Sequence, residues 1–199
     1  MTDPIVIAPV VEGHGEVAAL PVLLRRVGEL IAPDSWIDVH PPIRVNRGTL
    51  LKAGQLERYV ELAARSSERA AVLVLLDADD DCPAELGPDL LRRARAQRPE
   101  RQIAVVIAMR EFEAWFLAAA ESVAGQRGLS PDLKPPPDPE AIRDAKGWLQ
   151  DRRTDGLAYG PTIDQPALTA TFDLELARTR SASLDKLWRE VERLARMSS

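Results

Sequence analysis

Ala-Ala-Val-Leu-Val-Leu-Leu at residues 70–76, followed by Asp-Ala-Asp-Asp-Asp at residues 77–81, is the stretch that decides the fold of this chain. The first seven residues are apolar without alternation, which is typical of a strand covered by helices on both faces of a parallel sheet. The apolar run then ends abruptly in acidic residues. The sequence therefore predicts a buried central strand that carries carboxylates to one edge of a sheet.

Strand and helix patterns alternate on both sides of this central strand. Residues 5–11 and 103–109 are further apolar runs, and an irregular strand is expected within 36–45, which contains two prolines. Apolar residues recur at helical spacing in the segments 17–31, 52–64, 88–97 and 110–125. Pro21 is expected in the first turn of its helix, where proline is tolerated. This order predicts an α/β fold with a mostly parallel sheet and helices on both faces.

The pattern changes in the last third of the chain. Residues 130–139 are proline-rich and predict a stiff connector. Beyond it we expect a short helix at 140–150, an irregular stretch at 159–166 and a closing helix. This part of about 70 residues is too short for an independent domain. We therefore divide the chain into an α/β domain at 1–127 and a helical extension at 128–199 that packs on it.

Composition and charge exclude several classes of site. The chain has 199 residues, one cysteine and two histidines, which leaves no disulfide framework, no cysteine metal cage and no multi-histidine zinc site. The net charge of −5 is not that of a basic nucleic-acid-binding surface. No apolar run approaches the roughly 18 residues of a membrane span. We expect a cytoplasmic protein whose metal chemistry, if any, uses oxygen ligands.

Acidic residues follow three of the predicted strands. Glu12 follows the first, Asp77 and Asp79 follow the central strand, and Glu111 follows the next. Parallel strands end at the same edge of a sheet, where α/β proteins bind ligands. Each acid is also explained as a cap on the following helix, where negative charge is favourable. Three such positions at one edge favour a metal site, because clustered carboxylates repel one another unless a cation neutralises them.

Val11-Glu12-Gly13 after the first strand and Asp77-Ala78-Asp79 after a later one resemble the Toprim domain. That domain is shared by topoisomerases, bacterial primases and the overcoming-lysogenization-defect (OLD) nucleases, and the resemblance covers about residues 1–125. With Arg-Glu-Phe-Glu-Ala-Trp at 110–115, the whole chain is similar to a small bacterial Toprim-like family of unassigned function. The resemblance implies relatives encoded beside ABC-type or AAA-type ATPases in phage-defence loci.

The resemblance also implies roles for individual acids. Glu12 matches a glutamate that acts as general acid/base or metal ligand, and Asp77 and Asp79 match a pair that holds Mg²⁺. Glu16 would complete a second metal site or support the start of its helix, and Glu113 faces elsewhere. The residues thereby assigned to binding Mg²⁺ or Mn²⁺, with up to two ions, are Glu12, Glu16, Asp77, Asp79, Asp81 and Glu111.

Four basic side chains are candidates for binding the substrate. His14 lies in the glycine-flanked turn after the first strand, and Arg44 and Arg47 cluster near the end of the second. These positions suit contacts to a phosphate backbone, although residues of solvated loops have the same pattern. Lys146 lies in the C-terminal extension and would stabilise developing negative charge.

Together these features predict a metal-dependent phosphodiester hydrolase with Glu12, Asp77 and Asp79 as catalytic residues. The expected substrate is nucleic acid, with DNA favoured over RNA, and the expected partner is an ATPase in phage defence. The alternative is a non-catalytic, metal-binding regulatory or toxin subunit on the same scaffold. A receiver-like phosphoacceptor domain would carry its acidic pair after the first strand, where this chain has Glu12-Gly13.

Overall fold

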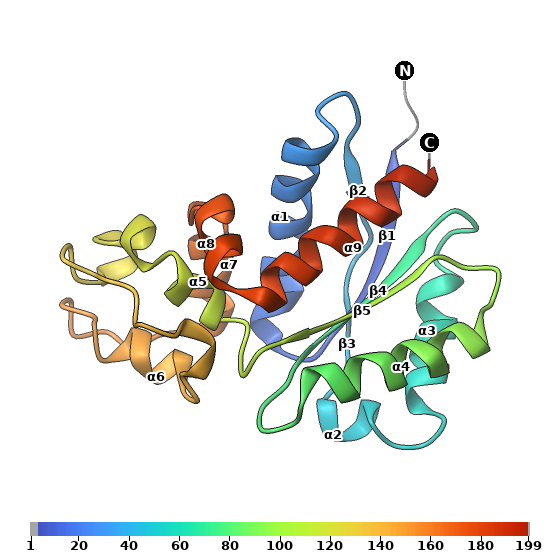
Figure 1. Cartoon of the computed structure of the whole chain (residues 1–199), viewed down its shortest axis with the longest axis horizontal. Coiled ribbons are helices and arrows are strands. Elements are labelled where there is room, and N and C mark those ends of the chain that lie inside the picture. The colour runs from blue at the N-terminus through green and yellow to red at the C-terminus, as the bar shows by residue number, and fades with distance from the viewer. Residues whose placement is uncertain (1–3, 199) are drawn as a thin grey trace.

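The apolar run at the centre of the sequence forms the central strand of a parallel sheet. The computed structural model describes residues 4–198. In it, β4 (Ala71–Asp77) lies between β1 (Ile5–Val11) and β5 (Ile103–Ala108). The sheet has five strands, all paired in parallel, in the order β2-β1-β4-β5, with β3 also beside β1 (Figure 1). The α/β fold with a mostly parallel sheet is confirmed.

Two short strands occupy the segment in which one irregular strand was expected. β2 (Ile37–Val39) and β3 (Ile43–Arg44) both run parallel to β1, at its first and second half respectively. The prolines at 41 and 42 separate them. Proline has no N–H to donate to a neighbouring strand, so the ladder stops there and resumes beyond.

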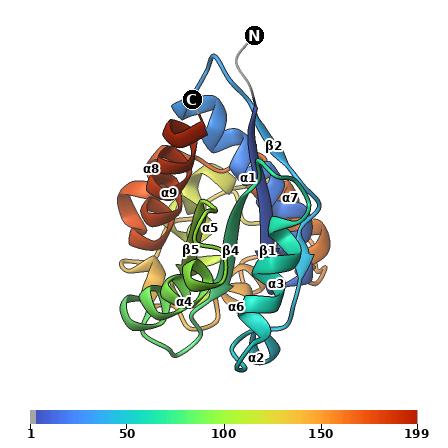
Figure 2. The ribbon, with the colours of Figure 1, turned by 90° about the vertical axis from the view of Figure 1, so that its right-hand side faces the viewer.

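The side chains of β4 alternate between two hydrophobic cores. Leu73 and Leu75 belong to the larger core, and Val72 and Val74 belong to the smaller one. Figure 2 shows the helices that form the two layers. The larger core is covered by α1 (His14–Ile31) and α9 (Ala182–Ser198), and the smaller by α3 (Gln55–Ala64) and α4 (Pro83–Gln97). Burial on both faces explains why this strand is apolar throughout.

Pro21 lies in the middle of α1, so its predicted place in the first turn is wrong. The helix begins at His14, seven residues earlier. The proline removes one intrahelical hydrogen bond, which normally breaks a helix. Its neighbours Leu20, Leu23 and Leu24 are fully buried in the larger core. Their packing holds the helix together where local propensity alone would end it.

Several helix boundaries differ from the sequence expectation. α4 begins at Pro83 rather than near residue 88, because proline fits the first turn. α3 begins only at Gln55, since Gly54 has a positive φ of 76°. A short helix that was not predicted, α2 (Arg47–Leu50), precedes it.

The segment after β5 is broken, whereas one helix at 110–125 was expected. α5 (Ala114–Ala118) has five residues and is followed by the 3₁₀ turn η1 (Ala120–Val123). Arg110 has a positive φ of 64° and Gly125 one of 73°, which bend the chain at both ends. Apolar spacing predicted the buried residues here but not the interruptions.

The C-terminal part contains more helix than expected. α6 (Ala145–Gln150) follows the 3₁₀ turns η2 (Gln126–Gly128) and η3 (Pro139–Ala141). α7 (Pro161–Thr169) covers most of the stretch expected to be irregular, with Pro161 at its first position. α8 (Leu174–Arg180) then leads to α9. These helices contribute to the larger core. The division of the chain after residue 127 stays a prediction.

Within residues 4–198, no helix combines the length and the hydrophobicity that crossing a membrane requires. The cytoplasmic location stays a prediction.

Candidate functional site

The carboxyl ends of β1 and β4 open into a cleft with a volume of about 420 Å³. Its walls come from the start of α1, from α6 and from α7. The predicted residues that line it are Glu12, His14, Glu16, Asp77 and Lys146. Residues far apart in the sequence thus meet at the sheet edge at which the acids were expected.

Glu12 is half-buried, and its Oε2 atom has no hydrogen-bond partner among the described residues. Burial raises the pKa of this carboxyl to about 7, and repulsion from Glu16 and Asp79 adds to the shift. Arg47 and the backbone N–H of Asp77 oppose it without cancelling it. An unpartnered buried carboxylate oxygen is costly unless a proton or a cation joins it.

Asp77 closes the gap between β4 and the segment after β5. Its Oδ1 accepts a hydrogen bond of 2.8 Å from the backbone N–H of Phe112, and its Oδ2 lies 3.9 Å from Nζ of Lys146. Burial raises its pKa well above the usual value, and the charge of Glu16 adds to that, while Lys146 opposes it. The Oδ1 atom of Asp77 therefore has a structural role, and its Oδ2 atom faces the ammonium group of Lys146.

Asp79 and Asp81 lie on the exposed loop after Asp77 and are held by Arg47. Nε of Arg47 is 3.7 Å from Oδ2 of Asp79 and donates to the backbone carbonyl of Asp77 at 3.2 Å. Its Nη2 pairs with Asp81. Asp79 has a positive φ of 51°, which turns the loop over the end of β4. Arg47, predicted as a substrate contact, thus braces the acidic loop in this structure.

Glu16 supports the start of its own helix, one of the two roles predicted for it. Its Oε2 accepts hydrogen bonds from the backbone N–H groups of Glu12 at 3.1 Å and Gly13 at 2.5 Å. This is the glutamate half of a capping box: the carboxylate at the third helical residue reaches back to the N-cap N–H, and Gly13 has no side chain to complete the pair. A Cβ on Gly13 would lie 2.6 Å from Oε1 of Glu16, so the glycine makes room for the cap.

Lys146 lies among three carboxylates. Its Nζ is 3.0 Å from Oε2 of Glu113, 3.2 Å from Oε1 of Glu111 and 3.9 Å from Oδ2 of Asp77. Glu111 also accepts the backbone N–H of Lys146 at 3.0 Å, which fixes the start of α6 against this edge. Burial lowers the pKa of the ammonium group, but the three acids outweigh burial and raise it. The ammonium group therefore offsets part of the negative charge of the acids that follow β5.

Glu113 is the site residue that sequence reasoning missed. Its side chain is fully buried, pairs with Lys146 and accepts a hydrogen bond of 3.2 Å from the hydroxyl of Tyr159. Burial raises the pKa of Glu113 despite the adjacent lysine. The sequence signal was the Glu-x-Glu spacing of Glu111 and Glu113. In one continuous helix, this spacing predicts that the two side chains point to different faces. The break before α5 instead turns both toward Lys146.

Of the remaining basic candidates, His14 lines the cleft and Arg44 lies outside its lining. His14 is the first residue of α1, is exposed and lines the cleft. Arg44 is exposed at the end of β3 and lies close enough to Glu16 to lower the pKa of that carboxyl, although burial raises it overall. Neither side chain forms an ion pair with the described residues.

The six acids assigned to metal binding do not form one ready-made cluster. In the part of the chain that is described, no three histidine, cysteine or acidic side chains lie close enough together to hold a metal ion. Glu16 caps a helix, Glu111 contacts Lys146, and Asp81 contacts Arg47. Glu12 is the carboxylate with a free oxygen in the cleft. Its oxygen and those of Asp77 and Asp79 are hard donors of the kind that Mg²⁺ and Mn²⁺ prefer.

Comparison with known proteins places the chain in a family. A family model described as a domain of unknown function, DUF4276, matches residues 11–192. The chain belongs to the DUF4276 family. The match runs from the end of β1 into α9, so the family includes the cleft and the C-terminal helices together.

A solved structure also resembles the chain as a whole. It is the C-terminal region of the OLD protein of Xanthomonas campestris pv. campestris, which is 12% identical, with a TM-score of 0.42, over 99% of this chain and 98% of that one. A TM-score this low supports no inference about activity. A search of curated proteins found no significant match.

Proposed function

We propose that this DUF4276 protein is a metal-dependent phosphodiester hydrolase. The observation that carries the proposal is the free Oε2 atom of Glu12, buried at the end of β1 in the cleft that Asp77 and Lys146 also line. Burial raises the pKa of Glu12 to about 7, so a cation bound beside it would relieve the cost of its negative charge. The Toprim-like order of Glu12, Asp77 and Asp79 along the chain supports the same function.

The oxygen donors on the Glu12 side of the cleft are of the kind that a divalent cation prefers, but in this structure they lie too far apart to hold one without moving closer together. Glu12, Asp77 and Asp79 would hold Mg²⁺ or Mn²⁺, which when bound supplies an acidified water and stabilises developing charge on a phosphate. On the other side, Lys146 forms ion pairs with Glu111 and Glu113. We therefore propose one metal ion rather than two, with the ammonium group of Lys146 as the second positive charge.

Different residues of the chain would then have different roles in hydrolysis. Glu12 would hold the cation through one oxygen and accept a proton from the attacking water through the other. Lys146 stabilises charge on the phosphate oxygens, and Glu111 and Glu113 keep it oriented. His14 and Arg44 bind neighbouring phosphates. A net charge of −5 makes such local cations necessary for any nucleic-acid substrate, and we propose DNA.

Cleavage of plasmid and single-stranded DNA in Mn²⁺ tests this proposal. Glu12→Gln keeps the size of the side chain but removes its charge and basicity. We expect turnover to fall by a factor of about 100 or more, the scale of a lost general base. The matched control Glu29→Gln, at an exposed position on α1, should cleave like the wild type. Equal cleavage by the wild type and Glu12→Gln would contradict the proposal.

A non-catalytic subunit is the second candidate, because the acids other than Glu12 are already engaged within the chain. Such a protein would bind Mn²⁺ through the same cleft without turnover. It would act on a partner, which we propose to be an ATPase encoded beside it, in phage defence. The cleavage assay is therefore run with and without the neighbouring ATPase. Metal binding with no cleavage in either case would favour this second candidate.

A further inference from the structure

The edge strand β5 has main-chain groups that face away from the sheet at Val105 and Ile107, residues that line a groove and are only 4% and 5% exposed. The backbone N–H of Val72 donates to the carbonyl of Gln102, and that of Ala78 donates to the carbonyl of Ala108. Hydrogen bonding alternates along a strand, so the even-numbered residues of β5 face β4. The main-chain groups of Ile103, Val105 and Ile107 therefore point away from the sheet, because β5 ends the strand order.

The outward groups are partnered only at the start of the strand. Nη2 of Arg193 donates to the carbonyl of Ile103 at 2.9 Å. The described residues supply no hydrogen bond to the outward groups of Val105 or Ile107. Natural sheets usually protect such an edge with charged residues or proline. β5 has neither, since its sequence is Ile-Ala-Val-Val-Ile-Ala.

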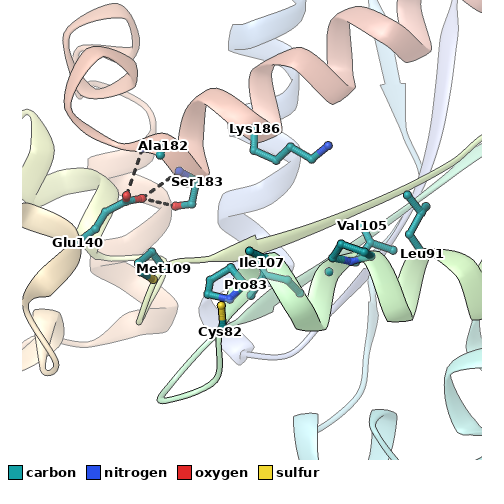
Figure 3. A pocket seen from close by; sticks show the side chains of 13 residues that line it. Cys82, Pro83, Leu91, Val105, Ile107, Met109, Glu140, Ala182, Ser183 and Lys186 are labelled. Carbon is teal, nitrogen blue, oxygen red and sulfur yellow. Dashed lines mark hydrogen bonds between the residues drawn. The ribbon is translucent and has the colours of Figure 1, made fainter.

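A groove of about 470 Å³ runs along these groups (Figure 3). Pro83 and Leu91 of α4 form one wall, and Ser183 and Lys186 of α9 form the other. Val105 and Ile107 line the groove from the strand side. It shares no residue with the acidic cleft, so this inference is independent of the proposed hydrolase.

The groove is electrically neutral. Its two charged side chains are Glu140 and Lys186. The carboxylate of Glu140 accepts hydrogen bonds from the backbone N–H of Ser183 at 3.0 Å and that of Ala182 at 3.1 Å, both at the start of α9. Lys186 pairs with Glu190. A complementary occupant therefore carries no charge within the groove and has apolar side chains.

Packing excludes β5 of a second copy as that occupant. α4 and α9 lie directly on the two faces of β5. Neighbouring strands are about 4.8 Å apart, whereas packed helices need about 8–10 Å. A second β5 at strand distance would bring its own α4 and α9 into these helices. A single extended segment without helices over its faces has no such conflict.

We propose that the open edge of β5 binds an extended, uncharged segment of a partner protein by strand addition. The segment's main chain exchanges hydrogen bonds with Val105 and Ile107. Its alternate apolar side chains contact the α4 and α9 walls. Affinity then comes from the main chain and specificity from the walls, as in other strand-addition sites.

Amide hydrogen exchange measured by NMR tests this binding mode. In the free protein, the amides of Val105 and Ile107 should exchange faster than those of Ala104 and Val106, which are bonded to β4. The probe is an acetylated, amidated heptapeptide of alternating threonine and valine. At saturation it should slow exchange at Val105 and Ile107 alone. Exchange unchanged by millimolar peptide would overturn the proposal, and so would protection that rises with protein concentration without peptide.

Two matched pairs of changes make the test specific. N-methylation of two peptide amides that face β5 should weaken binding about tenfold, because each loses a hydrogen bond to the strand. N-methylation of two of the alternate amides, which face away from β5, should have little effect. On the protein, Ala84→Glu places a charge in the groove at an exposed position of α4 and should abolish binding. Glu85→Lys, one residue along and outside the groove, should not. Equal binding by both variants, or by both N-methylated peptides, would contradict strand addition.

Discussion

Glu12 and Lys146 balance the charges of the cleft from opposite sides. Lys146 forms ion pairs with Glu111 and Glu113, the acids after β5, whereas Glu12 at the end of β1 has a buried oxygen and no ion pair among the described residues. The β5 side of the cleft thus has the ammonium group of Lys146 beside its acids, whereas Glu12 on the β1 side has no ion-pair partner in the described part of the chain.

The raised pKa of Glu12 predicts a pH-dependent gain in stability when it is replaced by glutamine. Its pKa is about 7 in the folded protein and 4.5 ordinarily. Between these values the unfolded chain loses its proton while the folded chain keeps it, so stability falls as pH rises. Without metal, Glu12→Gln should gain on the order of 1–2 kcal/mol at pH 8, after allowance for solvent screening, and nothing below about pH 4.5.

Urea unfolding in a chelator at several pH values measures this effect. Glu29→Gln on the exposed face of α1 is the control and should show no pH-dependent gain. A constant difference between Glu12→Gln and the wild type across this range would show that Glu12 keeps its ordinary pKa.

Lys146→Met should destabilise the protein by about 3–5 kcal/mol near neutral pH. The change leaves the buried carboxyl of Glu113 without its cation, and removing one partner of a buried pair has this scale of cost. Adding Glu113→Gln should recover much of the loss, because it removes the uncompensated charge. The control Lys186→Met disrupts a more exposed pair with Glu190 and should cost less than about 1 kcal/mol. Equal losses in both variants, by urea unfolding, would count against a special role for Lys146.

At the scale of elements, the contact between α1 and α7 shapes the cleft. A Cβ on Gly15 would lie 1.8 Å from Oε1 of Gln165 and 2.7 Å from the backbone carbonyl of Pro161. The backbone atom cannot give way as a side chain can. Gly15 is therefore required where the start of α1 meets the start of α7.

Gly15→Ala should lower the free energy of unfolding by roughly 1–3 kcal/mol through overpacking. Gly87→Ala is the matched control. It also adds a methyl group to a helix, but the nearest atom is Cγ1 of Ile107 at 3.6 Å. Because alanine favours helix over glycine, the control should be neutral or more stable by up to about 1 kcal/mol. Chemical denaturation compares the two, and a tolerated Gly15→Ala would show that α7 packs less tightly on α1.

The sequence predicted well those elements whose buried faces require apolar residues at a regular spacing. β4 and β5 are apolar on both faces, and the helices on either side show helical spacing. α7 was missed because two prolines and several polar residues hide a helix that long-range packing on α1 stabilises. Glu113 was missed for a related reason, since its direction depends on the break at Arg110 and not on local periodicity.

At the scale of the whole molecule, the sheet edge and the C-terminal helices form one site. Strand order alone placed Glu12 and Asp77 together, because parallel strands share an edge. The positions of Lys146 and Tyr159 depend on how a proline-rich connector returns to that edge, which no local pattern in the sequence encodes. The DUF4276 family match over residues 11–192 likewise includes both the sheet edge and the C-terminal helices.

Millimolar Mg²⁺ or Mn²⁺ should raise the melting temperature of the whole protein, because a ligand of the folded state stabilises it by mass action. Replacing Asp77 and Asp79 together with alanine should abolish the rise. The metal-free double variant should melt at a lower temperature, because the buried N–H of Phe112 loses its acceptor, and the relief of repulsion with Glu12 offsets only part of that loss. A metal-induced rise that survives in the double variant would place the cation elsewhere.

Calorimetric titration of the chelator-treated protein with Mn²⁺ near pH 7.5 tests the central claim most directly, because it measures binding without requiring turnover. The wild type should bind one ion per chain. Glu12→Gln should lose that binding, while Glu29→Gln should retain it. Release of a proton on binding, seen as a dependence of the heat on the buffer, is expected because the pKa of Glu12 is about 7. A Glu12→Gln variant that binds Mn²⁺ as the wild type does would contradict the account.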